Sequence, residues 1–210
     1  AAQDFARNQD ARSFEYSMAG QNDAQAFQRD QANLDRALEL DPEYPLTWQV
    51  LSAFLSTQMQ PKESLKAAER SVALAPNDPV NLMMLSKSQI SEGLIEKGLE
   101  TIEQAKHAFP IPPGYFQAFY ARALWANGLY PEAIRQADAC LHKIPRFVNC
   151  WIEKLVSMVD NNQLVEARST GKKLRQLIPQ VSHQRFVSNF ESQPALFRRR
   201  ESAASLIGLF

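Results

Sequence analysis

Apolar residues recur along this chain every three or four positions, which is the spacing of one face of an α-helix. In residues 114–147 the apolar and small residues at this spacing are Tyr120, Leu124, Ala133, Ala137 and Leu141. No alternating apolar and polar stretch is long enough to indicate a β-sheet. The pattern predicts an all-α protein.

Helix-breaking residues divide this pattern at a nearly fixed interval. Prolines end similar phrases at five places, separated by 34, 34, 35 and 34 residues: Pro42, Pro76, Pro110, Pro145 and Pro179. A helix that runs into a proline ends at or just before it, because proline has no N–H and clashes with the preceding turn. A second break lies near the middle of most units, where Pro61 and Pro131 suit the first turn of a new helix. Each unit therefore predicts helix, turn, helix, and such a period is typical of a solenoid.

These units give the predicted domain organisation. The solenoid covers residues 1–181, with units at about 11–44, 45–78, 79–112, 114–147 and 148–181. The pattern ends after Pro179, and residues 182–210 are predicted to form a helical cap. Its main helix is expected from Pro194 to about Ile207, and the residues expected to cover the open end of the last unit are Leu196, Ala203, Leu206 and Ile207.

The repeated positions resemble those of the tetratricopeptide-repeat (TPR) family over residues 11–181. That family has a large residue early in the first helix, a place occupied here by Trp48 and Trp151 in two units. It has small residues where the two helices cross, because helices about 8–10 Å apart leave no room for long side chains. The corresponding residues here are Ser52, Ser86, Ala121, Ser64, Gly98, Ala133, Ala167, Ala37, Ser71, Ala105 and Cys140. The resemblance implies a right-handed α-solenoid of about five helix pairs that binds other proteins.

Two segments are similar to a narrower group, the C-terminal repeat regions of bacterial signalling proteins. They are residues 112–133 and the aromatic turn from Phe186 to Phe190 with the final helix. In that group a class III adenylate cyclase domain or a winged-helix DNA-binding domain precedes the repeats. The resemblance implies that this chain, which begins at Ala1 without an initiator Met, is the sensor or partner-binding part of a longer protein. Two other roles stay open: a scaffold for envelope machinery such as a pilus, a secretion system or the cell wall, and a small-molecule sensor.

The first helices of such a stack line its inner face and predict a groove for a protein or peptide. The residues that helical geometry directs into this groove are Met83, Lys87, Ile90, Tyr115, Arg122, Trp125, Ile152 and Val156. Their apolar, aromatic and basic side chains suit an extended peptide or an amphipathic helix with an acidic group. The alternative for Tyr115 and Trp125 is packing within the solenoid. For the run Arg198–Arg200, the alternatives are an anion contact and an exposed helix face beside Glu201.

Composition and charge argue against several other functions. The chain has 23 Lys and Arg against 23 Asp and Glu, so it has no overall field to attract nucleic acid or an anionic membrane. Its apolar runs are too short to span a bilayer, and its seven glycines argue against a Gly-rich phosphate-binding loop. No nucleophile motif surrounds a serine, and His107, His142 and His183 lack the further ligands of a metal site. We therefore expect a non-catalytic chain without cofactor or metal, for which a homodimer through the open edges of the solenoid is compatible with the pattern.

The two cysteines lie close together in the predicted stack. Cys140 is late in the second helix of one unit, Cys150 begins the first helix of the next, and a short turn joins the two helices. A disulfide between them would link adjacent units and indicate an oxidising compartment such as the periplasm. The alternative is a pair of buried thiols in a cytoplasmic protein, with Cys140 serving as a small residue.

Overall fold

The computed structural model describes residues 24–109, 111–188, 190 and 193–210. All regular secondary structure in these residues is helical. The helices are α2 (Ala24–Leu40), α3 (Pro45–Thr57), α4 (Pro61–Leu74), α5 (Pro79–Ser91), α6 (Ile95–Ala108), α7 (Phe116–Ala126), α8 (Tyr130–Lys143), α9 (Val148–Asp160), α10 (Leu164–Leu177), α11 (His183–Val187) and α12 (Pro194–Ile207). None of the helices in this part of the chain has the length and apolar character needed to cross a bilayer.

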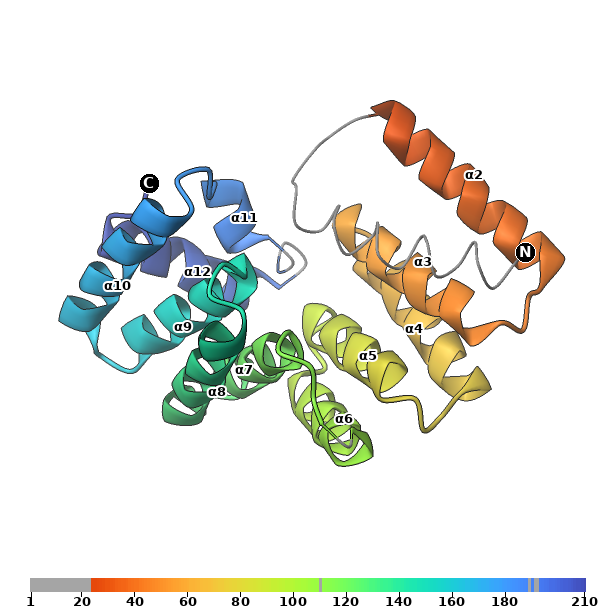
Figure 1. The fold of residues 1–210 in the computed structure, drawn as a ribbon, viewed down its shortest axis with the longest axis horizontal. Helices are drawn as coiled ribbons and strands as arrows, with labels where there is room; N and C mark the ends of the chain where they lie inside the picture. The colour runs from red at the N-terminus through yellow and green to blue at the C-terminus, as the bar shows by residue number, and fades with distance from the viewer. Residues whose placement is uncertain (1–23, 110, 189, 191–192) are drawn as a thin grey trace.

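Consecutive helices pair into hairpins, which stack along an arc (Figure 1). The hairpins are α3–α4, α5–α6, α7–α8 and α9–α10. The first helices α3, α5, α7 and α9 also contact one another in sequence and form one continuous row. Helix α2 packs on α3 at one end, and the first helix expected in unit 11–44 lies outside the described residues. The predicted all-α solenoid is confirmed.

The turn inside each hairpin has the same backbone geometry. One residue per turn has a left-handed conformation: Met59 (φ 57°), Gly93 (φ 86°), Gly128 (φ 78°) and Asn162 (φ 60°). The N–H of the next residue then returns to a carbonyl five residues earlier, at 2.8–3.0 Å in all four turns. This bond satisfies a carbonyl that the end of the helix would leave without a donor. The repeat in the sequence is therefore a repeat of local backbone structure.

The prolines at the unit boundaries also fix how one unit joins the next. The second helices end directly before them, as expected for a residue that cannot continue a helix. The indole Nε1 of Trp48 then donates to the carbonyl oxygen of Pro42 at 2.8 Å, and Trp151 makes the same bond to Pro145, also at 2.8 Å. The large residue of the repeat thus holds the start of one unit to the turn that ends the previous one.

Small side chains lie at the helix crossings, where the sequence predicted them. The Ser52 and Ser64 hydroxyls lie 3.2 Å apart, and Ser88 Oγ lies within 3.3 Å of both, so the three buried hydroxyls satisfy one another. At Gly98 a Cβ atom would lie 2.5 Å from Ile90 Cγ1, a distance that side chains do not tolerate. These small residues allow α3–α4 and α5–α6 to pack closely.

Helix α12 covers the C-terminal end of the solenoid by packing on α9 and α10. Leu196, Ala203 and Ile207 are buried, as expected. Leu206 is 42% exposed, so its predicted place in the covered face is wrong. Leu206 directly precedes Ile207, and it is the Ile207 side chain that contacts α10. Gly171 permits this approach, because a Cβ there would lie 2.6 Å from Ile207 Cγ2.

Candidate partner-binding face

The residues expected to line a groove all lie on, or next to, the row of first helices. They come from α5 (Met83, Lys87 and Ile90), the turn before α7 (Tyr115), α7 (Arg122 and Trp125) and α9 (Ile152 and Val156). Tyr115 is half-buried and the others are buried. The sequence therefore identified residues of one face, and their role in binding stays a prediction.

Trp125 is enclosed within the fold by the C-terminal cap. Its Nε1 donates to Asp160 Oδ2 at 2.6 Å, and the Phe190 ring packs edge-on against it at 5.5 Å between centroids. The guanidinium groups of Arg199 and Arg200 lie 4.6 Å and 4.9 Å from the centroid of its ring. Of the two arrangements considered for Trp125, the structure has packing within the fold, because α12 and its arginines cover the ring.

Glu153 on α9 is the centre of a buried ion-pair network that connects α7 with α12. Its carboxylate is fully buried and accepts from Arg122 Nε at 3.0 Å and from Arg200 Nη2 at 2.7 Å and 2.5 Å. Arg200 Nη1 also donates to the Phe186 carbonyl oxygen at 3.2 Å, which ties α12 to α11. Sequence analysis missed Glu153, because a single glutamate on a helix gives no indication of what it faces.

The run Arg198–Arg200 divides among three environments. Arg198 is exposed, Arg199 is part-buried, and Arg200 is almost fully buried. Arg199 Nη2 donates to Asp160 Oδ2 at 2.8 Å and to the Tyr130 hydroxyl at 3.0 Å. A single exposed face is thus wrong for Arg199 and Arg200, which anchor α12. Consecutive residues of a helix point about 100° apart, so three in a row cannot share one face.

Lys87, Arg122 and Arg185 form a second group of charges, which we call the cation cluster. Burial, with the charges of Arg122 and then Arg185, lowers the pKa of Lys87 to about 7. Burial and the charges of Arg122 and Arg200 also lower the pKa of Arg185, to about 10. Arg185 donates to Asn149 Oδ1 on α9 at 3.0 Å. Arg185 was not among the expected site residues, because it lies outside the repeats.

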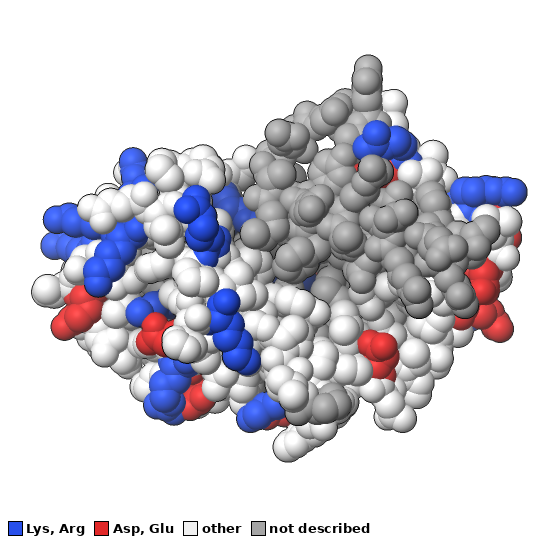
Figure 2. Space-filling model, in the orientation of Figure 1, with Lys and Arg blue, Asp and Glu red and all other residues white. Residues whose placement is uncertain are grey.

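The surface charges are a separate feature. Figure 2 shows Lys and Arg side chains gathered over the end of the molecule where α10 and α12 lie, with a few acidic side chains between them. Lys87 and Arg122 are buried, and Arg185 is half-buried. The cation cluster is therefore not a continuation of this solvated basic surface.

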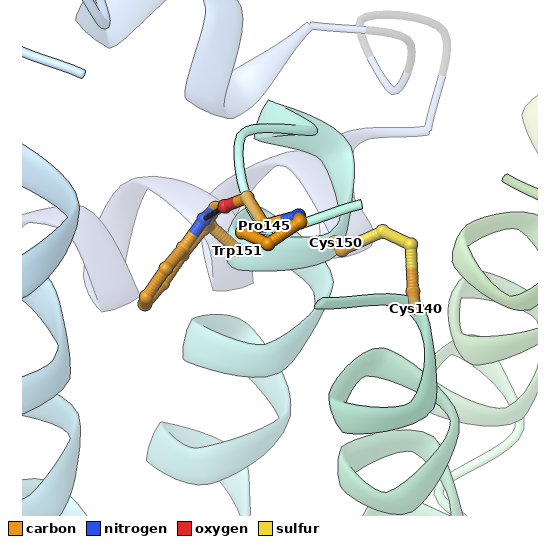
Figure 3. The surroundings of a disulfide bond; sticks show 4 residues. All are labelled: Cys140, Pro145, Cys150 and Trp151. Atoms are coloured by element: carbon orange, nitrogen blue, oxygen red, sulfur yellow. Dashed lines mark hydrogen bonds between the residues drawn. A yellow bond between two sulfur atoms is a disulfide. The ribbon is translucent and has the colours of Figure 1, made fainter. Parts of the chain in front are cut away.

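Cys140 and Cys150 form a disulfide that links α8 to α9 (Figure 3). Their Cα atoms are 6.1 Å apart, within the range that a disulfide requires, and both residues are fully buried. Of the two arrangements considered for these cysteines, the structure has the disulfide and not the pair of buried thiols. The bond lies beside the turn where Trp151 binds the Pro145 carbonyl, so both fix the same boundary between units (Figure 3).

The described part of the chain shows no cluster of three or more His, Cys, Asp or Glu residues that could hold a metal ion. His107, His142 and His183 are exposed. His183 lies on α11 and the other two lie on different second helices.

Comparison with solved structures identifies the fold. TTC0263, a thermophilic TPR protein of Thermus thermophilus, is 16% identical with a TM-score of 0.67, over 98% of this chain and 100% of that one. PilW, a type IV pilus biogenesis factor, is 14% identical with a TM-score of 0.66, over 95% and 92% of the two chains. YrrB, a TPR protein with an unusual peptide-binding site, is 14% identical with a TM-score of 0.53, over 82% and 88%. No protein-family model and no curated protein matches this chain. The fold is that of a TPR solenoid.

Proposed function

We propose that this chain is a non-catalytic protein-interaction module, which binds a segment of a partner protein on the row of first helices. Solenoids of this kind bind partners through extended surfaces formed by successive repeats. The solved structure of YrrB, which has the same fold, is described as having a peptide-binding site. The resemblance supports the class of function, and the chemistry of the face supports its location.

The observation that carries this proposal is Lys87. It is buried in the centre of the inner row, on α5, and no carboxylate of the described residues lies within ion-pair distance of it. A buried cation without a partner destabilises a folded protein, and an apolar residue of similar size would be better at a purely structural position. A lysine at this place is therefore best explained by something that binds there.

The C-terminal end of the row contributes less to binding in this proposal. Helix α9 is engaged by α12 through Glu153 and Asp160, which already have protein partners. The binding surface is accordingly assigned to α5 and α7, with the cap forming one boundary of it.

A peptide-display screen of the 210-residue chain, followed by hydrogen exchange, tests the proposal. Peptides selected by the chain should protect backbone amides of α5 and α7 from exchange. The outer helices α6 and α8 of the same hairpins are the internal control and should show no protection. Failure to select any peptide, or protection confined to α6 and α8, would refute the proposal.

The disulfide favours a setting in which the module works in an oxidising compartment such as the periplasm. Two roles fit there: the sensor region of a bacterial signalling protein, and an assembly factor for envelope machinery, the class that includes the pilus factor PilW. The open reading frame distinguishes them, since an upstream cyclase or winged-helix domain supports the first.

Alkylation in the intact source cells tests the compartment. Both cysteines should resist a thiol reagent until a reductant is added, and immediate labelling would contradict an oxidising compartment.

A further inference from the structure

Three helices bring the cation cluster together. Lys87 lies on α5 and Arg122 on α7, and these two helices pack against each other. Arg185 lies on α11, where its bond to Asn149 Oδ1 holds the guanidinium against α9. Its neighbour in sequence, Phe186, accepts a hydrogen bond from Arg200, so α11 is fixed beside the same network. The position of the cluster is thus set by repeats and cap together.

The cluster has more positive charge than its surroundings neutralise. The cluster and the adjoining Arg200 together have four basic side chains. Glu153 is the one carboxylate that the described residues place in an ion pair with any of them. That carboxylate is already used by Arg122 Nε and by Arg200. Lys87 and Arg185 have no carboxylate within ion-pair distance in the described part of the chain. A net charge of this sign attracts an anion.

One donor in the cluster is buried and unused. Arg122 Nη1 has almost no solvent exposure and no hydrogen-bond acceptor among the described residues. Buried donors of native proteins are nearly always bonded, because an unpaired one forfeits its hydration without compensation. By contrast, Trp125 Nε1 and Arg199 Nη2 both donate to Asp160 Oδ2. Arg122 therefore lacks an acceptor that a ligand can supply.

We propose that Lys87, Arg122 and Arg185 form a carboxylate-binding site that takes an Asp or Glu side chain from an acidic segment of the partner protein. The proposal rests on the protein-binding function given above and specifies its chemistry. The incoming oxygens would accept from Arg122 Nη1, the Lys87 ammonium and the Arg185 guanidinium, as in other charge-assisted hydrogen bonds. Binding would also place a negative charge beside Lys87, whose pKa is now lowered first by burial and then by the charges of Arg122 and Arg185.

The test is a titration of the chain with a short oligoglutamate peptide whose two ends are capped. Lys87→Met and Arg185→Gln should each weaken binding at least tenfold, because each removes one cationic donor. Lys97→Met and Arg198→Gln are the matched controls, since they remove the same charges from exposed positions. They should change the affinity less than twofold. Arg122 is left intact, because its bond to Glu153 also supports the fold.

Several outcomes overturn the proposal. Among them are no binding of oligoglutamate to the wild-type chain, unchanged affinity in both site variants, equal losses in the controls, and equally tight binding of inorganic phosphate. Equally tight binding of phosphate would identify a general anion site, and not a site for a protein carboxylate. A peptide that binds only with an uncapped C-terminus would likewise exclude an Asp or Glu side chain as the occupant. Display-selected peptides that protect α5 and α7 but bind Lys87→Met normally would leave the interaction module standing and remove only this site.

Discussion

Arg200 and Lys87 are both buried cations on the inner side of the solenoid, but their surroundings differ. Arg200 is 1% exposed and makes a two-oxygen contact with Glu153 and a bond to a backbone carbonyl. Lys87 is 8% exposed and has two arginines as its charged neighbours. Arg200 belongs to an ion-pair network with a carboxylate at its centre, which fixes the cap. The comparison teaches that partners, more than burial, separate a structural charge from a candidate binding charge.

The largest expected effect on stability concerns Glu153, the ion-pair partner of Arg200. Glu153→Gln removes the charge that Arg122 and Arg200 share, and leaves two buried guanidinium groups without a counter-charge. We expect a loss of about 3–5 kcal/mol in the free energy of unfolding. Denaturant unfolding measures it. Glu166→Gln, an exposed change on α10, is the control and should shift stability by less than about 0.5 kcal/mol. A loss in Glu153→Gln as small as in the control would mean that this network does not hold the cap.

The disulfide strengthens the same end of the molecule and should have the next largest effect. Cys140 and Cys150 are ten residues apart in sequence, and replacing both by Ser should cost about 3 kcal/mol of unfolding free energy through the lost chain constraint. Thermal unfolding with and without reductant checks this. The reductant should lower the melting temperature of the wild type to that of the double variant and leave the variant unchanged. An equal response in both proteins would show that the bond does not stabilise the fold.

The smallest effect concerns Lys87 and has the opposite sign. Lys87→Met should stabilise the chain by about 1–3 kcal/mol at pH 6, because it removes a buried charge and keeps the side-chain length. The pKa of Lys87 is about 7 in the folded protein, and its ordinary value is 10.5. Below pH 7 both states hold the proton and the cost of burial is complete. Between pH 7 and 10.5 the folded state loses the proton first, so the wild type gains stability relative to the variant as pH rises.

Unfolding curves of the wild type and Lys87→Met from pH 6 to pH 10 measure how the stability difference between the two proteins decreases as pH rises. The exposed change Lys97→Met is the control, and its small difference from the wild type should not vary in the same way. A stability difference for Lys87→Met that stays constant over this range would show that the lysine is not a destabilising buried cation. The argument for a binding charge at this position would then fail.

Much of the fold could be predicted because the repeat acts through local chemistry. A proline ends a helix wherever it occurs, and the pattern correctly gave a final helix from Pro194 to Ile207. The small residues at the crossings, such as Gly98 and Ala133, are buried as the repeat required. These features depend on spacing along the chain, which a sequence displays directly.

The candidate site was predictable only in part. Helical geometry placed Lys87 and Arg122 on the inner row, but it gave no means to pair Arg122 with Glu153, 31 residues away. It also missed Arg185, which reaches the row from the cap. Trp125 looked like an anchor for a partner, and the chain's own cap covers it.

The sequence by itself determined a stack of helical hairpins, since proline, glycine and the 34- or 35-residue interval act through the backbone nearby. The tertiary structure alone decided which charges are satisfied. That depends on the angle at which α11 and α12 return to α7 and α9, and a few ångströms separate an ion pair from a repulsive contact. Glu153 and Arg200, 47 residues apart, became partners on that basis, while Lys87 and Arg122 became neighbours of the same sign.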